Sequence, residues 1–318
     1  MAVTPKIPGN ERFSEWFAYL QRLLAAVDSG KSIALGPSPA PPMPPTVSAA
    51  QPGTAKVVYC APHPDDESLS GALALRLRLE AGARVTNIAV TLGSDPAQRD
   101  RRRRELESAC RVLGFDLVIP GTGNSSPPAG FDHVTSATRE AEPGEWARSV
   151  QALAAILDRE RPEAVFAPHA NDFNRTHVGT HQLVLDALAV HLSRRTAASV
   201  ILIETEYWHE LAEPNLMVAV TPEIAALQIT AAAEHGGEMS RAPFHLLHPC
   251  RLLDNGRRGS EVVGGQGKPA QPVALAELYR VSFRRGSEAL SARPGGRILV
   301  RSERATLDWL RREFWPAD

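Results

Sequence analysis

The chain has 318 residues, and its 35 lysines and arginines nearly balance 36 aspartates and glutamates, which leaves a net charge of −1. This balance excludes a generally basic nucleic-acid-binding protein. A hydrophobic fraction of 43% and a charged fraction of 22% are typical of a soluble globular protein. No apolar run reaches the roughly 18 residues that a transmembrane helix needs. We therefore expect neither a nucleic-acid partner nor a membrane span.

The cysteines and the N-terminus indicate the cellular compartment. The three cysteines, Cys60, Cys110 and Cys250, are far apart in the sequence and form no CxxC pair. They predict neither a disulfide framework nor a cysteine-ligated zinc site. Residues 1–10 lack the charged start and apolar core of a secretory signal. Both observations favour a cytoplasmic location.

Residues 11–28 predict an amphipathic helix, because large apolar side chains recur there at spacings of three and four residues. A proline-rich stretch follows, and its prolines favour extended backbone over helix or central strand. We therefore divide the chain into a helical arm over residues 1–35, a linker over 36–55 and a single α/β domain over 56–318. The arm packs either on its own chain or on a neighbouring chain, and the second alternative would make the protein a homo-oligomer.

From Lys56 onward, short apolar runs alternate with longer amphipathic segments. This alternation is typical of βαβ units, which build a Rossmann-like, mostly parallel sheet with helices on both faces. In such sheets, ligands bind beyond the carboxyl ends of the strands, where the strand order reverses. The expected strands are Lys56–Ala61, Arg84–Leu92, Asp116–Pro120, Glu163–Pro168 and Ser199–Glu204, and the expected helices are Ser68–Ala81, Ala97–Leu113, Glu145–Glu160 and Thr176–Ser193.

The C-terminal extension carries weaker patterns. We expect a helix over Pro222–Glu234, a long glycine- and arginine-rich loop over Arg251–Lys268, a strand over Leu275–Phe283 and a final amphipathic helix over Ser302–Phe314. Long loops in compact domains are often functional. Two adjacent arginines in this loop either grip a substrate or stabilise the loop through neighbouring carboxylates.

The densest group of chemically active side chains directly follows the first expected strand. The segment PHPDDE at residues 62–67 places one imidazole and three carboxylates within five residues. A metal ion would offset the repulsion between neighbouring carboxylates, and histidine with carboxylate is a common set of zinc ligands. The alternative interpretation is an aspartate N-cap followed by a glutamate in the first helical turn.

A second group follows the fourth expected strand, in the segment HANDFNRTH at residues 169–177, with His181 one turn further. Both groups then lie at the same edge of a parallel sheet, and His177 begins a helix, so that its side chain can face the first segment. A lone histidine is more often a packed or capping residue. Here, however, several polar residues share the same expected edge.

These two segments resemble the motifs of the PIG-L/LmbE family. PHPDDE follows a first strand, and a later histidine opens a helix after the sequence APH-x-x-D. Weaker matches include TLG at residues 91–93 and AEH at residues 233–235. The resemblance spans roughly residues 56–285 and implies a zinc-dependent de-N-acetylase that acts on substrates containing N-acetylglucosamine.

The resemblance implies roles for individual side chains. His63, Asp66 and His177 would hold zinc and leave an open position for a metal-bound water as nucleophile. Asp65 would be the general base. Iron, cobalt or nickel could occupy the same ligand set. The remaining candidates, which would bind substrate or support the site, are Glu67, Arg102, His169, Asp172, Asn174 and His235.

Two positions depart from the family pattern. Many members carry His-Pro-Asp-His before the helix, with the first histidine as an acid, whereas this chain has Asn174 in that segment. An asparagine can donate a hydrogen bond to an oxyanion but no proton at neutral pH, which leaves His169, His235 or protonated Asp65 as the acid. Ser94 stands where a glutamate often follows Thr-x-Gly, which changes a position linked to substrate specificity.

We expect a metal-dependent amide hydrolase that removes an N-acetyl or other acyl group from an amino sugar or its conjugate. The alternative is a catalytically silent, metal-bearing carbohydrate-binding or scaffold protein of the same fold, which the Asn174 departure motivates. Retention of Asp65 argues against this alternative, because a structural metal needs no spare carboxylate. A third interpretation is an amidase for a thiol conjugate or an antibiotic intermediate, because fold does not determine substrate.

Overall fold

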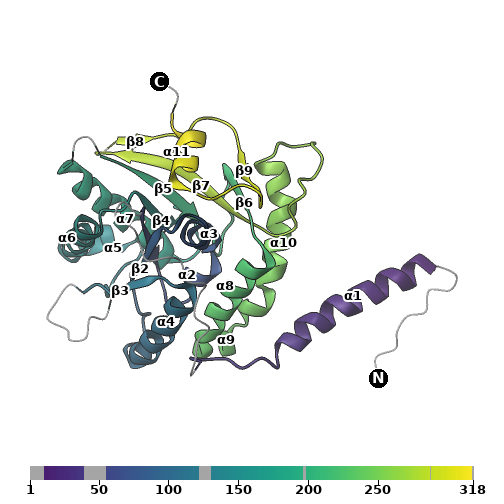
Figure 1. Cartoon of the computed structure of the whole chain (residues 1–318). Coiled ribbons are helices and arrows are strands. Elements are labelled where there is room, and N and C mark those ends of the chain that lie inside the picture. Colours follow the sequence, from purple (N-terminus) through teal and green to yellow (C-terminus); the bar gives the residue numbers. More distant parts are fainter. Residues whose placement is uncertain (1–10, 39–54, 122–129, 196–197, 287, 317–318) are drawn as a thin grey trace.

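The computed structural model of this chain describes residues 11–38, 55–121, 130–195, 198–286 and 288–316. The strands are β1 (Lys56–Ala61), β2 (Arg84–Ala89), β3 (Asp116–Val118), β4 (Ala164–Pro168), β5 (Ser199–Thr205), β6 (Leu216–Ala219), β7 (Ala276–Arg285), β8 (Glu288–Leu290) and β9 (Arg297–Leu299). They form one mixed sheet in the order β3-β2-β1-β4-β5-β7-β6-β9, with β8 paired to β7. Figure 1 shows helices packed on both sides of this sheet.

Five neighbouring strands, in the order β3-β2-β1-β4-β5, run parallel and form the centre of the sheet. Alternate residues of β1 enter two separate apolar cores, with Val57 and Tyr59 on one face and Val58 and Cys60 on the other. Burial on both faces explains why these strands are continuous apolar runs in the sequence. The strand order reverses between β1 and β4, so their carboxyl ends flank the crevice where α/β sheets bind ligands. The expected Rossmann-like fold is confirmed.

Two groups of helices cover the sheet. The helices are α1 (Glu11–Gly30), α2 (Asp66–Leu69), α3 (Ala72–Ala81), α4 (Arg99–Leu113), α5 (Thr138–Ala141), α6 (Pro143–Glu160), α7 (Arg175–Ser193), α8 (Pro222–Glu234), α9 (Gly236–Arg241), α10 (Phe244–Val262) and α11 (Leu307–Phe314), with a 3-10 turn at Pro96–Gln98. α6 and α7 contribute to the core on one face of the sheet. α3, α4, α8 and α11 contribute to the core on the other.

The single helix expected over Ser68–Ala81 is wrong, because two helices, α2 and α3, replace it. Between them, the backbone carbonyl of Ser70 accepts a hydrogen bond from the hydroxyl of Tyr59 at 3.1 Å. The carboxylate of Glu277 in β7 accepts from the first amide of α3, that of Ala72, at 2.9 Å. Side chains from two distant strands therefore stabilise the break, and the local sequence does not contain this information.

The loop expected over Arg251–Lys268 is also wrong, because α10 continues as a helix to Val262. Its glycines serve close packing. A Cβ at Gly259 would lie 2.7 Å from the side chain of Leu278 in β7, and one at Gly256 would lie 2.7 Å from a backbone oxygen just before that strand. Only glycine permits so close an approach of helix and sheet, which offsets its low helix propensity.

Several element ends and short elements also differ from expectation. The strand expected over Arg84–Leu92 ends at Ala89. The final helix begins at Leu307 rather than Ser302, because the hydroxyl of Thr306 caps it. The sequence does not predict β6, α9, β8 or β9, which have three to six residues each and show little periodicity.

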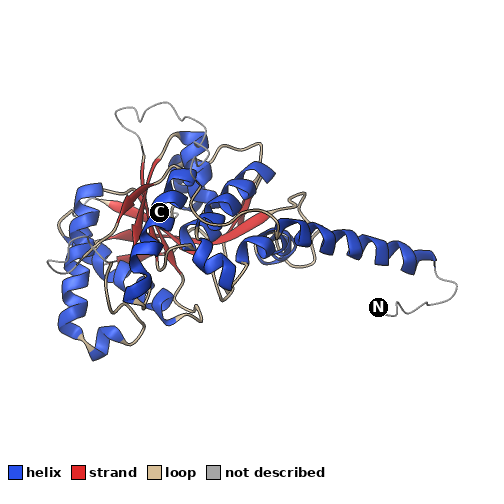
Figure 2. Cartoon of the chain, turned by 90° about the horizontal axis from the view of Figure 1, so that it is seen from below, coloured by secondary structure: helices blue, strands red, loops and turns tan. Residues whose placement is uncertain are grey.

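The predicted N-terminal helix is present as α1, which extends away from the rest of the molecule in Figures 1 and 2. Of the proline-rich linker expected over residues 36–55, residues 39–54 lie outside the described residues. Within the described parts of the chain, no helix combines the length and apolarity needed to cross a membrane.

Candidate active site

The segment after β1 is a tight, buried turn. The backbone of Asp65 has a φ of 117°, in the region that residues other than glycine rarely adopt. Its amide donates to Glu67 Oε2 at 3.0 Å, and its carbonyl accepts from the hydroxyl of Ser68 at 2.6 Å. Arg102 from α4 donates to the preceding carbonyl, that of Pro64, at 3.2 Å. These contacts hold a strained backbone in place, as is frequent at functional sites.

Three side chains from the two predicted motifs meet at the carboxyl ends of β1 and β4. His63 Nδ1 lies 3.2 Å from His177 Nε2, and each of these nitrogens lies 3.3 Å from Asp66 Oδ2. His63 and Asp66 belong to the turn after β1, and His177 lies in the first turn of α7. Among the described residues, no other group of histidine, cysteine or carboxylate side chains converges in this way.

This donor set fits a transition-metal ion. Zinc binds imidazole nitrogen and carboxylate oxygen at about 2.0–2.2 Å, and tetrahedral ligands at such distances lie about 3.3 Å from one another. The three separations in this group, 3.2, 3.3 and 3.3 Å, match that spacing. Three protein ligands leave one position open, which is typical of catalytic rather than structural zinc sites.

Neighbouring groups determine the orientation of His177, whose side chain is fully buried. Its second ring nitrogen, Nδ1, lies 3.5 Å from Asp172 Oδ1, and Tyr207 packs edge-on against the ring at 4.8 Å between centroids. Asp172 in turn accepts from the backbone amides of Asn174 and Trp208, at 2.8 and 3.1 Å. A carboxylate behind a ligand imidazole orients the ring and sets its tautomer.

Charge also holds this group together. Burial alone would lower the pKa of His177, but the carboxylates of Asp66 and Asp172 outweigh burial and raise it to about 10. Burial opposes ionisation of Asp66 as well, yet His177 and His63 hold its pKa far below the usual range. The two carboxylates thus create a negative potential at this position, which favours a bound cation.

A second buried cluster surrounds Asp65. Burial, together with the charge of Asp66, raises the pKa of Asp65 well above its usual range, while His235 and Arg102 act in the opposite direction. His235 Nε2 lies 2.7 Å from Glu67 Oε1, and both side chains are fully buried. Glu67 therefore connects His235 to the backbone amide of Asp65. The imidazole that Glu67 contacts is that of His235, which is not a candidate metal ligand.

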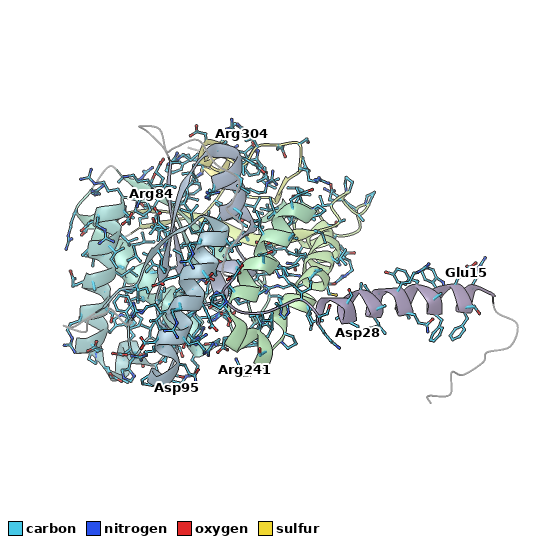
Figure 3. The ribbon with its side chains drawn as sticks, turned by 60° about the horizontal axis from the view of Figure 1, so that its bottom comes forward. Glu15, Asp28, Arg84, Asp95, Arg241 and Arg304 are labelled. Atoms are coloured by element: carbon cyan, nitrogen blue, oxygen red, sulfur yellow. The ribbon has the colours of Figure 1, made fainter. Side chains whose placement is uncertain are left out.

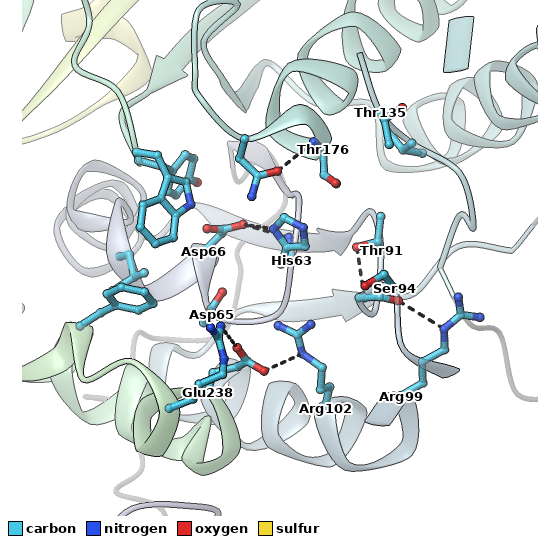
Figure 4. Close-up of a pocket in the computed structure, with 18 of the residues that line it drawn as sticks. His63, Asp65, Asp66, Thr91, Ser94, Arg99, Arg102, Thr135, Thr176 and Glu238 are labelled. Carbon is cyan, nitrogen blue, oxygen red and sulfur yellow. Dashed lines mark hydrogen bonds and ion pairs between the residues drawn. The ribbon is translucent and has the colours of Figure 1, made fainter. Parts of the chain in front are cut away.

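The site opens into a cavity of about 720 Å³, shown in close-up in Figure 4. We name its base the acidic floor, which consists of His63, Asp65 and Asp66 with His177 directly behind them. We name another side, formed by α9 and α10, the helical wall. The residues of the helical wall are Glu238, Arg241, Phe244, Leu247, His248 and Arg251.

The structure brings some of the predicted site residues into the cavity and leaves others outside it. Arg102 and Asn174 line the cavity. His169 is not among the lining residues, and its Nε2 lies 2.9 Å from the backbone oxygen of His209. His235 is buried beside the acidic floor and does not line the cavity. Sequence reasoning therefore identifies the right neighbourhood, but it does not identify which polar residues reach the open space.

Arg257 and Arg258, the two adjacent arginines considered as substrate contacts, both lie outside the cavity lining. Arg258 is held in an ion pair with Glu206 at 2.6 Å, and Arg257 pairs with Asp254 at 2.8 Å, so both stabilise the fold locally. Sequence reasoning misses the two arginines of the helical wall. Arg241 lies in α9, which the sequence does not predict, and Arg251 lies in the part of α10 that is expected to be a loop.

The fold and this geometry define a Rossmann-like α/β protein with a candidate metal centre at the switch point of its sheet. Residues 58–188 match the family model of PIG-L, described as GlcNAc-PI de-N-acetylase. These residues include both motifs, so the expected resemblance to the PIG-L family is confirmed over this range. No match was found among curated proteins.

Three solved structures illustrate the likeness in fold. The conserved protein TT1542 from Thermus thermophilus is 20% identical, with a TM-score of 0.50 over 71% of this chain and 93% of that one. GalB, the 4-carboxy-2-hydroxymuconate hydratase from Pseudomonas putida, is 17% identical, with a TM-score of 0.52 over 75% and 100%. N,N'-diacetylchitobiose deacetylase from Pyrococcus horikoshii is 16% identical, with a TM-score of 0.51 over 74% and 86%. A hydratase and a deacetylase thus share one fold, so the chemistry must be argued from the site.

Proposed function

We propose that this protein is a zinc-dependent hydrolase that removes an N-acetyl group, or a similar acyl group, from an amino sugar or an amino-sugar conjugate. One observation carries the proposal. Three ligand atoms converge on the acidic floor, and the carboxylate of Asp65, which is not one of them, lines the same cavity. The match of residues 58–188 to a de-N-acetylase family supports the same reaction class.

Asp65 is the residue we propose as general base. A bound zinc ion would supply Lewis-acid activation of a water molecule and of the acyl carbonyl. Asp65 would accept a proton from the water as its oxygen bonds to the acyl carbon. When the C–N bond breaks, the protonated Asp65 would return this proton to the departing amine, which leaves as a free amino sugar. The acyl group would leave as a carboxylic acid that loses its remaining proton to solvent. The raised pKa of Asp65 favours a carboxyl that can hold the proton between these steps.

Two further residues are positioned to assist. Asn174 Oδ1 accepts a hydrogen bond from the backbone amide of Thr176 at 2.9 Å and so caps α7. This contact directs the side-chain nitrogen, Nδ2, away from the helix. Asn174 and Arg102 both line the cavity and can donate hydrogen bonds to a carbonyl oxygen or to sugar hydroxyls. The location of His169 and His235 outside the cavity lining supports Asp65 over either of them as the acid.

The proposal is tested by measuring acetate and free amine released from a panel of N-acetylglucosamine and its glycosides. The zinc-loaded protein is compared with Asp65→Asn, a substitution that suits the positive φ at this position. We expect kcat to fall roughly 10²- to 10⁴-fold in this variant, with about one zinc ion per chain retained. Asp132→Asn is the matched control, because Asp132 lines the same cavity but pairs with Arg99 at 2.7 Å.

Two outcomes contradict the proposal. Absence of turnover by the zinc-loaded protein on every N-acyl amino sugar would favour the silent carbohydrate-binding alternative. Equal turnover by Asp65→Asn and the unchanged protein would remove Asp65 from the chemistry.

A further inference from the structure

α1 is attached to the molecule at one end and leaves it at the other. At its base, a Cβ at Gly30 would lie 2.6 Å from the side chain of Leu246 in α10. The following segment is anchored on α8, where the amide of Gly36 donates to the carbonyl of Ala233 at 2.8 Å. From this base the helix extends away from the other elements in all three views of the whole chain, and Figure 3 labels Glu15 and Asp28 along it.

The extended part of α1 carries a continuous apolar face. Trp16 is 65% exposed, Leu24 64% and Leu20 52%. Such side chains at spacings of three and four are typical of a helix that packs against another surface. Most helices in proteins owe their stability to such packing rather than to propensity. The residues of the apolar face are Phe13, Trp16, Phe17, Leu20, Leu23, Leu24 and Val27.

The charges of α1 exclude two kinds of partner. The helix contains two arginines and three carboxylates. Amphipathic helices that bind anionic membranes have a polar face rich in lysine and arginine, and phosphate backbones require the same charge. α1 lacks this charge, so its apolar face fits an apolar protein surface. A second copy of the chain presents the same face, and twofold pairing is the commonest form of self-association.

We propose that α1 packs antiparallel against α1 of a second copy, which makes the protein a twofold-symmetric dimer. The aromatic residues of the apolar face lie in the first half of the helix, and smaller aliphatic residues lie in the second half. Antiparallel packing with Leu20 at the twofold axis places Trp16 against Leu24 of the second copy. Large side chains then meet small ones and fill the interface evenly, whereas a parallel pair would crowd the aromatic rings at one end.

The size and attachment of α1 also suit this pairing. The helix has 20 residues and is therefore about 30 Å long. Because each body is joined to the C-terminal end of its helix, antiparallel pairing places the two bodies at opposite ends, where they do not overlap. Covering the apolar faces of two such helices would bury on the order of 1,200 Å², which reaches the lower limit of specific interfaces.

The dimer is tested by sedimentation equilibrium on the full chain. We expect the unchanged protein to have twice the mass of one chain, and Leu20→Glu to have the mass of one chain, because it places two carboxylates at the axis. Ala18→Glu is the matched control: it adds the same charge to the opposite face of α1 and should leave the dimer intact. Circular dichroism and metal content should be equal in all three proteins.

Disulfide cross-linking tests the direction of the pairing. The background carries Cys250→Ser, because Cys250 is exposed whereas the other two cysteines are buried. A mixture of Trp16→Cys chains with Leu24→Cys chains should form a disulfide-linked pair under mild oxidation, and Trp16→Cys chains alone should not.

Several results would overturn the inference. The unchanged protein could sediment as a monomer, with or without binding of α1 to anionic lipid vesicles. Leu20→Glu could leave the dimer intact, which would place the interface elsewhere, or Ala18→Glu could dissociate it equally. Cross-linking of Trp16→Cys chains alone would show a parallel pair and contradict the antiparallel arrangement.

Discussion

The acidic floor and the helical wall face the same cavity, but their side chains differ in burial and in their contacts with the rest of the fold. On the floor, Asp66 is buried, accepts from the amide of His63 at 2.9 Å and lies 3.3 Å from two imidazoles. On the wall, Leu247 is 56% exposed, and exposed Arg241 pairs with Glu238 at 2.7 Å. Asp66 is therefore held by contacts on several sides, whereas Leu247 and Arg241 of the wall are exposed to solvent.

The two surfaces also differ in their relation to the family. Residues 58–188, which match the PIG-L family model, include the whole acidic floor, whereas the helical wall lies outside this range. On the proposed function, we infer that the floor carries the reaction and that the wall contacts the substrate. Substitutions on the two surfaces should therefore change different quantities.

The largest effect is expected from His177→Ala on the floor. Removing one of three candidate ligands should abolish both bound zinc and turnover, a greater loss than the roughly 10- to 100-fold that follows loss of a supporting residue. Metal content by plasma mass spectrometry measures the result. His181→Ala is the control, because His181 lies one turn further along α7 and its Nδ1 lies 2.9 Å from the carbonyl oxygen of Pro168. Zinc retained in His177→Ala would contradict the assignment.

Glu67→Gln tests the support beneath the floor. The change keeps the shape of the side chain but removes the charge that holds His235 and the amide of Asp65. We expect kcat to fall about 10- to 100-fold with zinc still bound, because supporting groups orient the reacting ones. Glu234→Gln is a matched control, since this carboxylate is also buried but accepts from Ser108 at 2.6 Å. Equal kcat in both variants would show that Glu67 has only a structural role.

The lowered pKa of His248 on the helical wall predicts that the stability of the fold depends on pH. Burial, together with the charge of Arg251, lowers the pKa of His248 to about 4, against about 6.5 in an unfolded chain. As the pH falls below 6.5, the unfolded state binds a proton that the folded state does not, so the free energy of unfolding decreases. Between pH 7.5 and pH 5 this one group should account for about 2 kcal/mol.

Urea unfolding of the unchanged protein and of His248→Gln at both pH values measures this contribution. The variant lacks the titrating group, so its stability should fall less between pH 7.5 and pH 5. The same fall in both proteins would mean that His248 is protonated equally in the folded and unfolded states.

The smallest effect is expected from Trp208→Ala beside the helical wall. Trp208 lines the cavity, is 55% exposed and packs edge-on against Phe244 at 5.2 Å between centroids. Loss of its indole should raise KM about 3- to 10-fold and leave kcat nearly unchanged. This change corresponds to roughly 1 kcal/mol of lost apolar contact with the substrate. Trp208→Phe should retain most of the affinity. A fall in kcat with constant KM would move Trp208 from binding to the chemistry.

Much of the parallel half of the sheet could be predicted from the sequence, and so could the two motifs at its edge. β1 has the bounds that its apolar run predicts, and β4 begins only one residue later than expected. Strands buried on both faces leave a strong local pattern, and the polar residues directly after them must lie at the carboxyl edge. The meeting of His63 with His177, 114 positions apart, follows from this topology alone.

The sequence by itself determined the succession of the parallel strands β1 to β5 along the chain and the chemical character of the acidic floor, because both are encoded in short stretches of neighbouring residues. Only the tertiary structure decided that α10 is a helix with Gly256 and Gly259 against the sheet, and that Glu277 begins α3 from 205 positions away. It also decided which polar residues reach the cavity and that α1 leaves the body. These features depend on contacts between distant segments, and the packing energy of such contacts outweighs the local preference of glycine for loops and of Ser68–Ala81 for one unbroken helix.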